Sequence, residues 1–233
     1  MKLALSALFS ASALSQSTDY PYQTSIHKAA RDGEIYSVRH FFEKEPKKPR
    51  FDPNTRDTWN KTAAHYAAEY GHADIIVEMR RHRADLNARD YRQRTPLILA
   101  ASKGFVMATR KLVGYKVDFN AVDESGRNAL HWAAEFGHDD VINFLVANAS
   151  KSDPTPNMDV NQKTISTGKT PLVLAAERGN DDCVIALLRN GAKADLADDA
   201  GATAAMYAAK HGHEDTLNVS CRIEDHVLGP IFI

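Results

Sequence analysis

Apolar and polar residues follow each other along this chain in short bursts that recur at a fixed interval. Each burst opens with a small polar residue, continues with apolar residues around an Ala-Ala pair, and closes with a glycine nine residues after its start. The opening residues are Thr24, Thr62, Thr95, Asn128, Thr170 and Thr203, and the closing ones are Gly33, Gly71, Gly104, Gly137, Gly179 and Gly212. Both markers advance by 38, 33, 33, 42 and 33 residues, which indicates an architecture of stacked repeats.

Each repeat predicts two short helices. Threonine or asparagine at the opening position suits a helix N-cap, and Pro96 and Pro171 fall at the first helical position, where proline is tolerated. The closing glycine is expected to end the first helix in the left-handed conformation. A second apolar stretch follows at helical spacing, as in residues 184–188, and a polar turn such as residues 84–88 ends the repeat.

Two segments carry the pattern of a known family. Residues 123–138 read DESGRNALHWAAEFGH and residues 170–179 read TPLVLAAERG, and both resemble the ankyrin repeat family. The resemblance implies an all-α repeat solenoid of helix–turn–helix units joined by β-hairpin-like loops, with the inner helices lining a concave face. We expect this domain to span residues 20–226. Its units are expected near residues 20–56, 57–89, 90–122, 123–165, 166–197 and 198–226.

The sequence departs from the family pattern at several places. Arg83, Lys116 and Ala149 stand where the family favours glycine, so we expect backbone strain or a different conformation there. The connections at residues 46–53 and 151–168 are longer than the others. The tail at residues 227–233 is apolar, and it either folds back as a cap, mediates association, or marks a truncated or alternative end.

The N-terminal residues 1–19 allow two interpretations. One lysine, a short apolar stretch and small residues near Ala13 and Ser15 outline a weak secretory signal peptide. The alternative is a disordered N-terminus on a cytoplasmic protein, so both compartments stay open. Three N-x-Ser/Thr sequons start at Asn60, Asn148 and Asn218, and they matter only if the chain is secreted. No apolar run is long enough to predict a transmembrane segment.

Candidate chemistry is sparse. His27, His65 and His131 occur once per repeat, and stacking separates them by about 10 Å each, too far to share a metal ion. We expect them to make hydrogen bonds that stabilise the turns. Cys183 and Cys221 are expected to be small buried residues without a disulfide bond. The chain carries no phosphate-binding loop and no serine nucleophile motif, so we predict no catalytic residue, no metal, no cofactor and no enzyme.

Surface recognition is the remaining function. In the resembled family, partners commonly contact the loop tips and the two positions before the closing glycine. Trp, Tyr and Arg side chains contribute most of the energy in many interfaces. The predicted partner-binding residues are Trp59, Tyr70, Tyr91, Arg92, Arg94, Arg127, Phe136, Lys169 and Arg178. The alternative is that their rings only pack against neighbouring units, while Tyr66, Trp132 and Tyr207 are expected to face the core.

The charge distribution adds two further hypotheses. The net charge is −1, but residues 80–116 hold 10 basic and 2 acidic side chains, whereas residues 117–233 hold 9 basic and 18 acidic ones. Our leading hypothesis is a non-catalytic protein–protein interaction module or scaffold. The alternatives are binding of an anionic surface through residues 80–116, with nucleic acid ranked below protein, or a structural subunit whose basic middle meets the acidic half of another copy. The sequence identifies neither the partner nor the oligomeric state.

Overall fold

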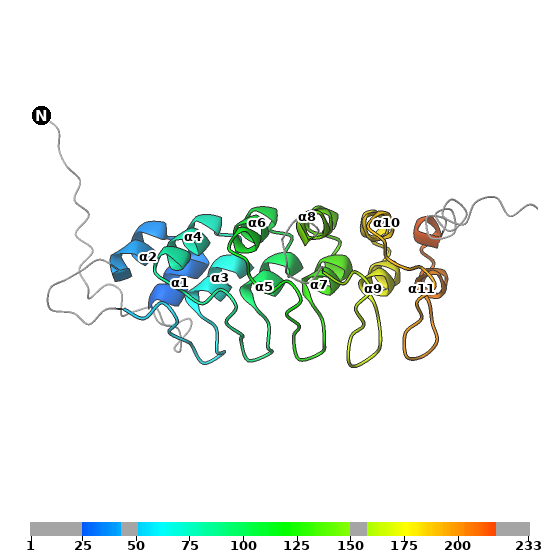
Figure 1. The fold of residues 1–233 in the computed structure, drawn as a ribbon, viewed down its shortest axis with the longest axis horizontal. Coiled ribbons are helices and arrows are strands. Elements are labelled where there is room, and N and C mark those ends of the chain that lie inside the picture. The colour runs from blue at the N-terminus through cyan, green and yellow to red at the C-terminus, as the bar shows by residue number, and fades with distance from the viewer. Residues whose placement is uncertain (1–24, 43–50, 150–157, 218–233) are drawn as a thin grey trace, which may run out of the picture.

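The computed structural model of the protein describes residues 25–42, 51–149 and 158–217, and it arranges the helices in two layers (Figure 1). The inner layer consists of α1 (Ser25–Asp32), α3 (Ala63–Glu69), α5 (Pro96–Ser102), α7 (Ala129–Phe136), α9 (Pro171–Arg178) and α11 (Ala204–His211). The outer layer consists of α2 (Ile35–Phe42), α4 (Ala73–Arg81), α6 (Val106–Gly114), α8 (Asp139–Ala149) and α10 (Asp181–Arg189). Each helix packs against the next helix of its own layer, and these residue ranges contain no strand. The predicted all-α solenoid of stacked helix pairs is confirmed.

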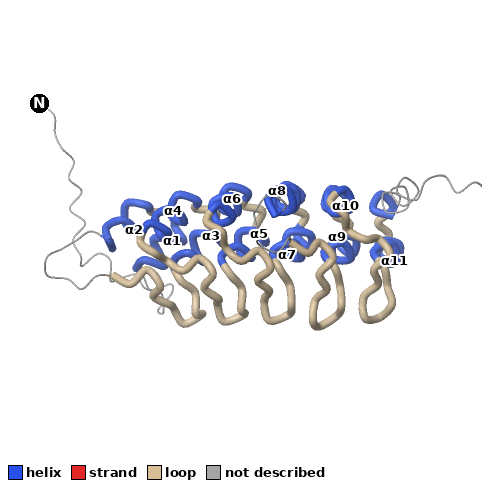
Figure 2. The backbone as a smooth tube through the Cα atoms, viewed as in Figure 1, coloured by secondary structure: helices blue, strands red, loops and turns tan. Residues whose placement is uncertain are grey.

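The loops between successive units all project from the same side of the inner layer (Figure 2). Backbone hydrogen bonds join each loop to the one before it. Tyr91 donates its N–H to the carbonyl of Trp59 at 3.0 Å, and Glu124 donates to Arg92 at 3.0 Å. Two further bonds continue the series, from Ile165 to Ser125 at 3.0 Å and from Asp199 to Thr167 at 3.1 Å. The loop tips therefore form one continuous, mutually supported edge.

The helix ends follow the sequence prediction. The side chains of Thr95 and Thr170 accept hydrogen bonds from backbone N–H groups three residues further on, as N-caps do. The closing glycine of the fourth unit, Gly137, has a φ of 79° and ends α7 in the left-handed conformation. At Gly104, with a φ of 73°, a Cβ atom would also lie 2.6 Å from the ring of His138. Conformation and space both require glycine at that turn.

The core runs along the whole array between the two layers. The paired alanines of units two to five are fully buried, and their small side chains let adjacent inner helices approach closely. Large apolar side chains of the outer helices fill the space above them, including Ile75, Ile76, Met79, Leu112, Ile142 and Leu145. In the last unit Ala208 is buried but Ala209 is exposed, because no further inner helix covers it within the part of the chain that the structure describes.

The three departures from the glycine pattern have two outcomes. Arg83 and Lys116 adopt φ values of 65° and 56°, the left-handed conformation that Gly191 takes in the fifth unit with a φ of 88°. The expected strain is confirmed, because a Cβ atom makes this conformation costly. Ala149 differs: α8 extends through it, so this position is helical and the chain makes no left-handed turn there.

Some sequence predictions lie outside the described residues. These are the signal peptide at residues 1–19, the position of Cys221 and the apolar tail at residues 227–233. Across the residues that are described, no helix is both long enough and apolar enough to span a membrane.

Candidate functional site

Four aspartates give the loops a common geometry. Asp57, Asp90, Asp123 and Asp198 stand at the base of the loops of units two, three, four and six, and one carboxylate oxygen of each accepts two backbone N–H bonds; Thr164 stands at this position in unit five. For Asp90 the donors are Arg92 and Arg94, both at 2.9 Å. The same pair of bonds, at 2.8 to 2.9 Å, occurs at the other three aspartates. Each of these aspartates therefore fixes the backbone of its loop, and the residues at the tip point towards solvent.

The second carboxylate oxygen ties the loop to its inner helix. Tyr66 and Tyr207 donate their hydroxyl groups to Asp57 and Asp198 at 2.7 Å, and the indole N–H of Trp132 lies 2.9 Å from Asp123. Tyr66 is buried as expected, whereas Trp132 and Tyr207 are only half-buried. These three aromatic side chains position the loops.

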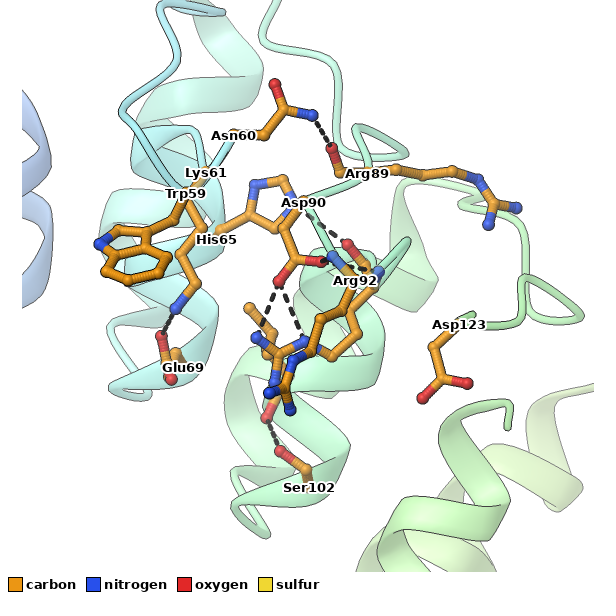
Figure 3. A network of polar contacts seen from close by, with 12 residues as sticks. Trp59, Asn60, Lys61, His65, Glu69, Arg89, Asp90, Arg92, Ser102 and Asp123 are labelled. Atoms are coloured by element: carbon orange, nitrogen blue, oxygen red, sulfur yellow. Dashed lines mark hydrogen bonds and ion pairs between the residues drawn. The ribbon is translucent and has the colours of Figure 1, made fainter. Parts of the chain in front are cut away.

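In the third unit a different side chain donates to the second carboxylate oxygen of the aspartate. Leu99 occupies the aromatic position there and has no donor to offer. The guanidinium of Arg94 takes its place and donates to Asp90 from Nε at 3.0 Å and from Nη2 at 2.8 Å. Figure 3 shows Asp90 at the centre of this network, beside the ring of His65. Asp90 is completely buried, so its charge depends on Arg94.

A row of ion pairs connects the loop bases to the ends of the inner helices. Lys61 donates to Glu69 (Figure 3), and these two atoms are 2.5 Å apart, while Arg127 bonds Glu135 at 2.6 Å. The third pair joins Lys169 to Glu177 at 2.7 Å. Burial lowers the pKa of Lys169, but the hydrogen bond and the charge of Glu177 outweigh it, so this pKa is raised overall.

Three of the predicted site residues are therefore held within the protein. The side chains of Arg94, Arg127 and Lys169 are only 17, 27 and 16 % exposed, and each is engaged by a carboxylate. Arg178 is different: it bonds Glu135 at 2.7 Å but remains exposed on the surface. The first three stabilise the loops, whereas the side chain of Arg178 remains 58 % exposed.

The aromatic candidates are partly packed and partly exposed. Trp59, Tyr70, Tyr91 and Phe136 are 52, 48, 47 and 52 % exposed. The rings of Trp59 and Tyr91 lie 5.6 Å apart, and Phe136 stacks on Trp132 at 5.8 Å. Trp59 and Tyr91 thus pack across neighbouring units and Phe136 packs on its own helix, while about half of each side chain stays exposed.

The remaining loop candidate, Arg92, lies at a loop tip. Its guanidinium stands 5.4 Å from the centre of the Tyr91 ring and 4.0 Å from the carboxylate of Glu124. Arg92 is exposed, and this ion pair is at the limit of contact. The structure therefore brings Trp59, Tyr91 and Arg92 together on adjacent loop tips.

One exposed apolar residue escaped the sequence analysis. Ile165 lies at the tip of the loop of the fifth unit and is 76 % exposed. Its backbone N–H bonds the carbonyl of Ser125, as the N–H of Tyr91 bonds Trp59, so the two tips are equivalent. This loop carries one extra residue before Lys169, which shifts the alignment. An alignment that counts back from the N-cap, Thr170, therefore does not match Ile165 with Tyr91.

The histidines and the buried cysteine have structural surroundings. The ring of His27 contacts the carbonyl of Thr55 at 2.9 Å, and burial lowers the pKa of both His65 and His131 to about 4. Burial also raises the pKa of the Cys183 thiol to about 12. Within the described ranges, no group of histidine, cysteine or acidic side chains is arranged to hold a metal ion.

Comparisons with known proteins agree with this geometry. A family model described as ankyrin repeats (3 copies) matches residues 78–158 and 152–219, and one described as ankyrin repeats (many copies) matches residues 50–100. No curated protein sequence matches the chain. The fold is similar to the crystal structure of an ankyrin repeat domain from Acinetobacter baumannii AYE, with a TM-score of 0.71 and 24% identity. That match covers 85% of this chain and 97% of the other. Because the family models match more than half of its length, this chain belongs to the ankyrin repeat family.

Proposed function

We propose that this protein is a non-catalytic interaction module that binds a segment of a partner protein. The binding surface, which we call the loop face, comprises the exposed side chains of Trp59, Tyr70, Tyr91, Arg92 and Phe136. Ankyrin repeat domains typically act as protein-interaction modules, which supports the class of function. The observation that supports the location is that four aromatic side chains remain about half exposed on loop tips and inner-helix ends.

Half-exposed aromatic rings favour association. An aromatic side chain buries about 150–250 Å² when fully covered. Covering the remaining half removes about 100 Å² from water, so each ring gains about 2.5 kcal/mol before the cost of association. Several such rings are needed, because association itself costs about 4–15 kcal/mol.

The loop face is also held in place before any partner arrives. Carboxylates at the loop bases fix the backbone below each tip, and hydrogen bonds join successive tips. Fewer conformations are therefore lost when a partner binds, and a larger share of the interaction energy contributes to affinity.

A matched pair of variants tests this function. The triple variant Trp59→Ala, Tyr91→Ala, Phe136→Ala removes three rings of the loop face. The control variant Tyr36→Ala, Met107→Ala removes two exposed apolar side chains of the outer helices, which are 81 and 58 % exposed. Affinity capture from extracts of the native host, quantified by mass spectrometry, should lose its partners with the triple variant and keep them with the control. Circular dichroism should show equal helicity in both, and unchanged capture by the triple variant contradicts the proposal.

A second candidate function concerns the outer helices. The exposed basic residues Arg80, Arg83, Arg110, Lys111 and Lys116 lie on α4, on α6 and in the turns after them, and none makes an ion pair with another described residue. Their unbalanced charge favours binding of an anionic surface. Retention on a heparin column that falls steeply with salt, and falls further in Arg80→Gln, Arg110→Gln, would support this candidate.

Assembly with other copies remains the third hypothesis. A basic middle and an acidic C-terminal half would attract each other between chains at low ionic strength. Light scattering across a range of salt concentrations should then show a mass that falls as salt rises, and a constant monomer mass would exclude this hypothesis.

A further inference from the structure

The row of carboxylates at the inner-helix ends contains one gap. Glu69, Glu135 and Glu177 occupy equivalent positions in units two, four and five, and each bonds the basic residue eight positions earlier. The equivalent residue of the third unit is Ser102, eight positions after Arg94. The basic residue is therefore retained in this unit, but the carboxylate that should accompany it is not.

Two local features keep this gap open. The hydroxyl of Ser102 donates to the carbonyl of Leu99 at 2.8 Å, so it is turned back towards its own helix (Figure 3). Arg94 is drawn to Asp90 and uses only its Nε and Nη2 atoms there. No described residue accepts a hydrogen bond from its Nη1, and 17 % of the side chain remains exposed. Arg94 therefore keeps a donor that no described residue uses, in the unit whose inner helix lacks the carboxylate.

The charges around the gap are positive. Lys103, the next residue, is exposed and forms no ion pair with any other part of the chain that is described. Arg92 is exposed on the loop tip of the same unit, with Glu124 as far away as 4.0 Å. The charge of Arg94 is balanced by Asp90, which leaves Lys103 and Arg92 as surplus positive charge. A negatively charged group is the ligand that this position favours.

Apolar surface flanks the gap on both sides. Tyr70 and Phe136 occupy, in the neighbouring units, the position that Lys103 occupies in the third, and both are about half exposed. Packed helices lie about 8–10 Å apart, so the ends of α3 and α7, two helices apart, are separated by about 16–20 Å, with the end of α5 between them. An extended chain advances about 3.3 Å per residue, so about five to six residues span this separation.

We propose that the loop face binds an extended segment in which one Asp or Glu side chain occupies the Ser102 gap, flanked by apolar residues about three positions away on each side. The carboxylate would accept from Arg94 and meet the positive charge of Lys103, while the apolar residues cover Tyr70 and Phe136. This inference rests on the proposed function and adds the chemistry of the partner to it.

Peptide selection tests the chemistry without knowledge of the natural partner. The probe is a library of random 12-residue peptides displayed on phage and selected against the full-length protein. Enriched peptides should contain one acidic residue with an apolar residue about three positions before it and another about three after it. Affinities of a synthetic enriched peptide are then measured by fluorescence anisotropy.

Two variants at one position separate charge from size. Ser102→Glu supplies a carboxylate from the protein itself, as units two, four and five do. It should lower the affinity for the enriched peptide by about tenfold or more. Ser102→Gln has the same size without the charge and should bind within about threefold of the parent. A peptide whose acidic residue is replaced by its amide should bind the parent and Ser102→Glu equally weakly. Glu69 shows that a glutamate fits at this helix end, and thermal unfolding checks that both variants fold.

The outcomes distinguish the two proposals. Enriched peptides without an acidic residue, or equal binding by Ser102→Glu and Ser102→Gln, overturn the Ser102 inference while leaving the loop face as a binding surface. The proposed function is wrong if the Trp59→Ala, Tyr91→Ala, Phe136→Ala variant binds every selected peptide as the parent does, or if no peptide is selected at all. The inference then fails with it.

Discussion

Two buried histidines should make the stability of this protein depend on pH. His65 and His131 are completely buried near the start of α3 and α7, and each Nδ1 accepts the N–H of its N-cap residue, Thr62 at 3.1 Å or Asn128 at 3.2 Å. Burial, which disfavours the charged ring, lowers the pKa of both to about 4 from 6.5.

The magnitude follows from linkage between protonation and folding. Below pH 6.5 the unfolded chain binds a proton at each ring, whereas the folded protein does so only below about pH 4. The contribution of the two neutral histidines to the free energy of unfolding is therefore fully present above pH 6.5, and it is lost as the pH falls from 6.5 towards 4. Each pH unit costs about 1.4 kcal/mol per histidine, so at pH 5 each costs about 2 kcal/mol and both cost about 4 kcal/mol. Domains are typically stable by only about 5–15 kcal/mol, so this loss is measurable.

Urea unfolding followed by circular dichroism at pH 7 and pH 5 measures this loss. Glutamine at the same helical position can still accept the N-cap N–H but carries no titrating group. The double variant His65→Gln, His131→Gln should therefore lose about 4 kcal/mol less than the parent between the two pH values, and each single variant about half of that. If the double variant loses as much stability as the parent, the buried histidines do not govern the pH dependence.

Three further predictions follow from single contacts. Arg83→Gly should raise the free energy of unfolding by about 1 kcal/mol, because glycine relieves the left-handed backbone; an unchanged urea midpoint would contradict this. Tyr66→Phe removes the hydroxyl that bonds Asp57 at 2.7 Å and should lower the free energy of unfolding by about 1.5–3 kcal/mol in the same assay, whereas a loss near zero would show that the bond is dispensable. In a Cys221→Ser background, Cys183 should react with a thiol reagent only after unfolding, since burial raises its pKa to about 12; rapid labelling of the folded protein would refute the assignment.

Much of the fold could be predicted because it is local and repeated. The N-cap threonines, the Ala-Ala pairs and the closing glycines act within one unit, so each repeat of the pattern independently predicts the same structure. The left-handed conformation of Arg83 and Lys116 could be predicted for the same reason, because Gly191 stands at the equivalent turn of the fifth unit. Ala149 takes the other expected alternative, a different conformation, because α8 includes this residue.

The candidate site was harder to predict because its contacts cross between elements. The sequence identifies Arg94, Arg127 and Lys169 as exposed candidates by their position in the repeat. Their carboxylate partners are four residues away for Arg94 and eight residues away for Arg127 and Lys169. The third unit has neither an aromatic donor at Leu99 nor a carboxylate at Ser102, and there Arg94 bonds Asp90, which the folded geometry shows.

The location of binding can be measured directly by hydrogen–deuterium exchange with and without the captured partner. The proposed function predicts slower exchange in residues 58–70, 91–103 and 124–136, which carry the loop tips and inner-helix ends of units two to four. Protection confined to the outer helices α4 and α6 would contradict it and would favour the basic outer surface instead.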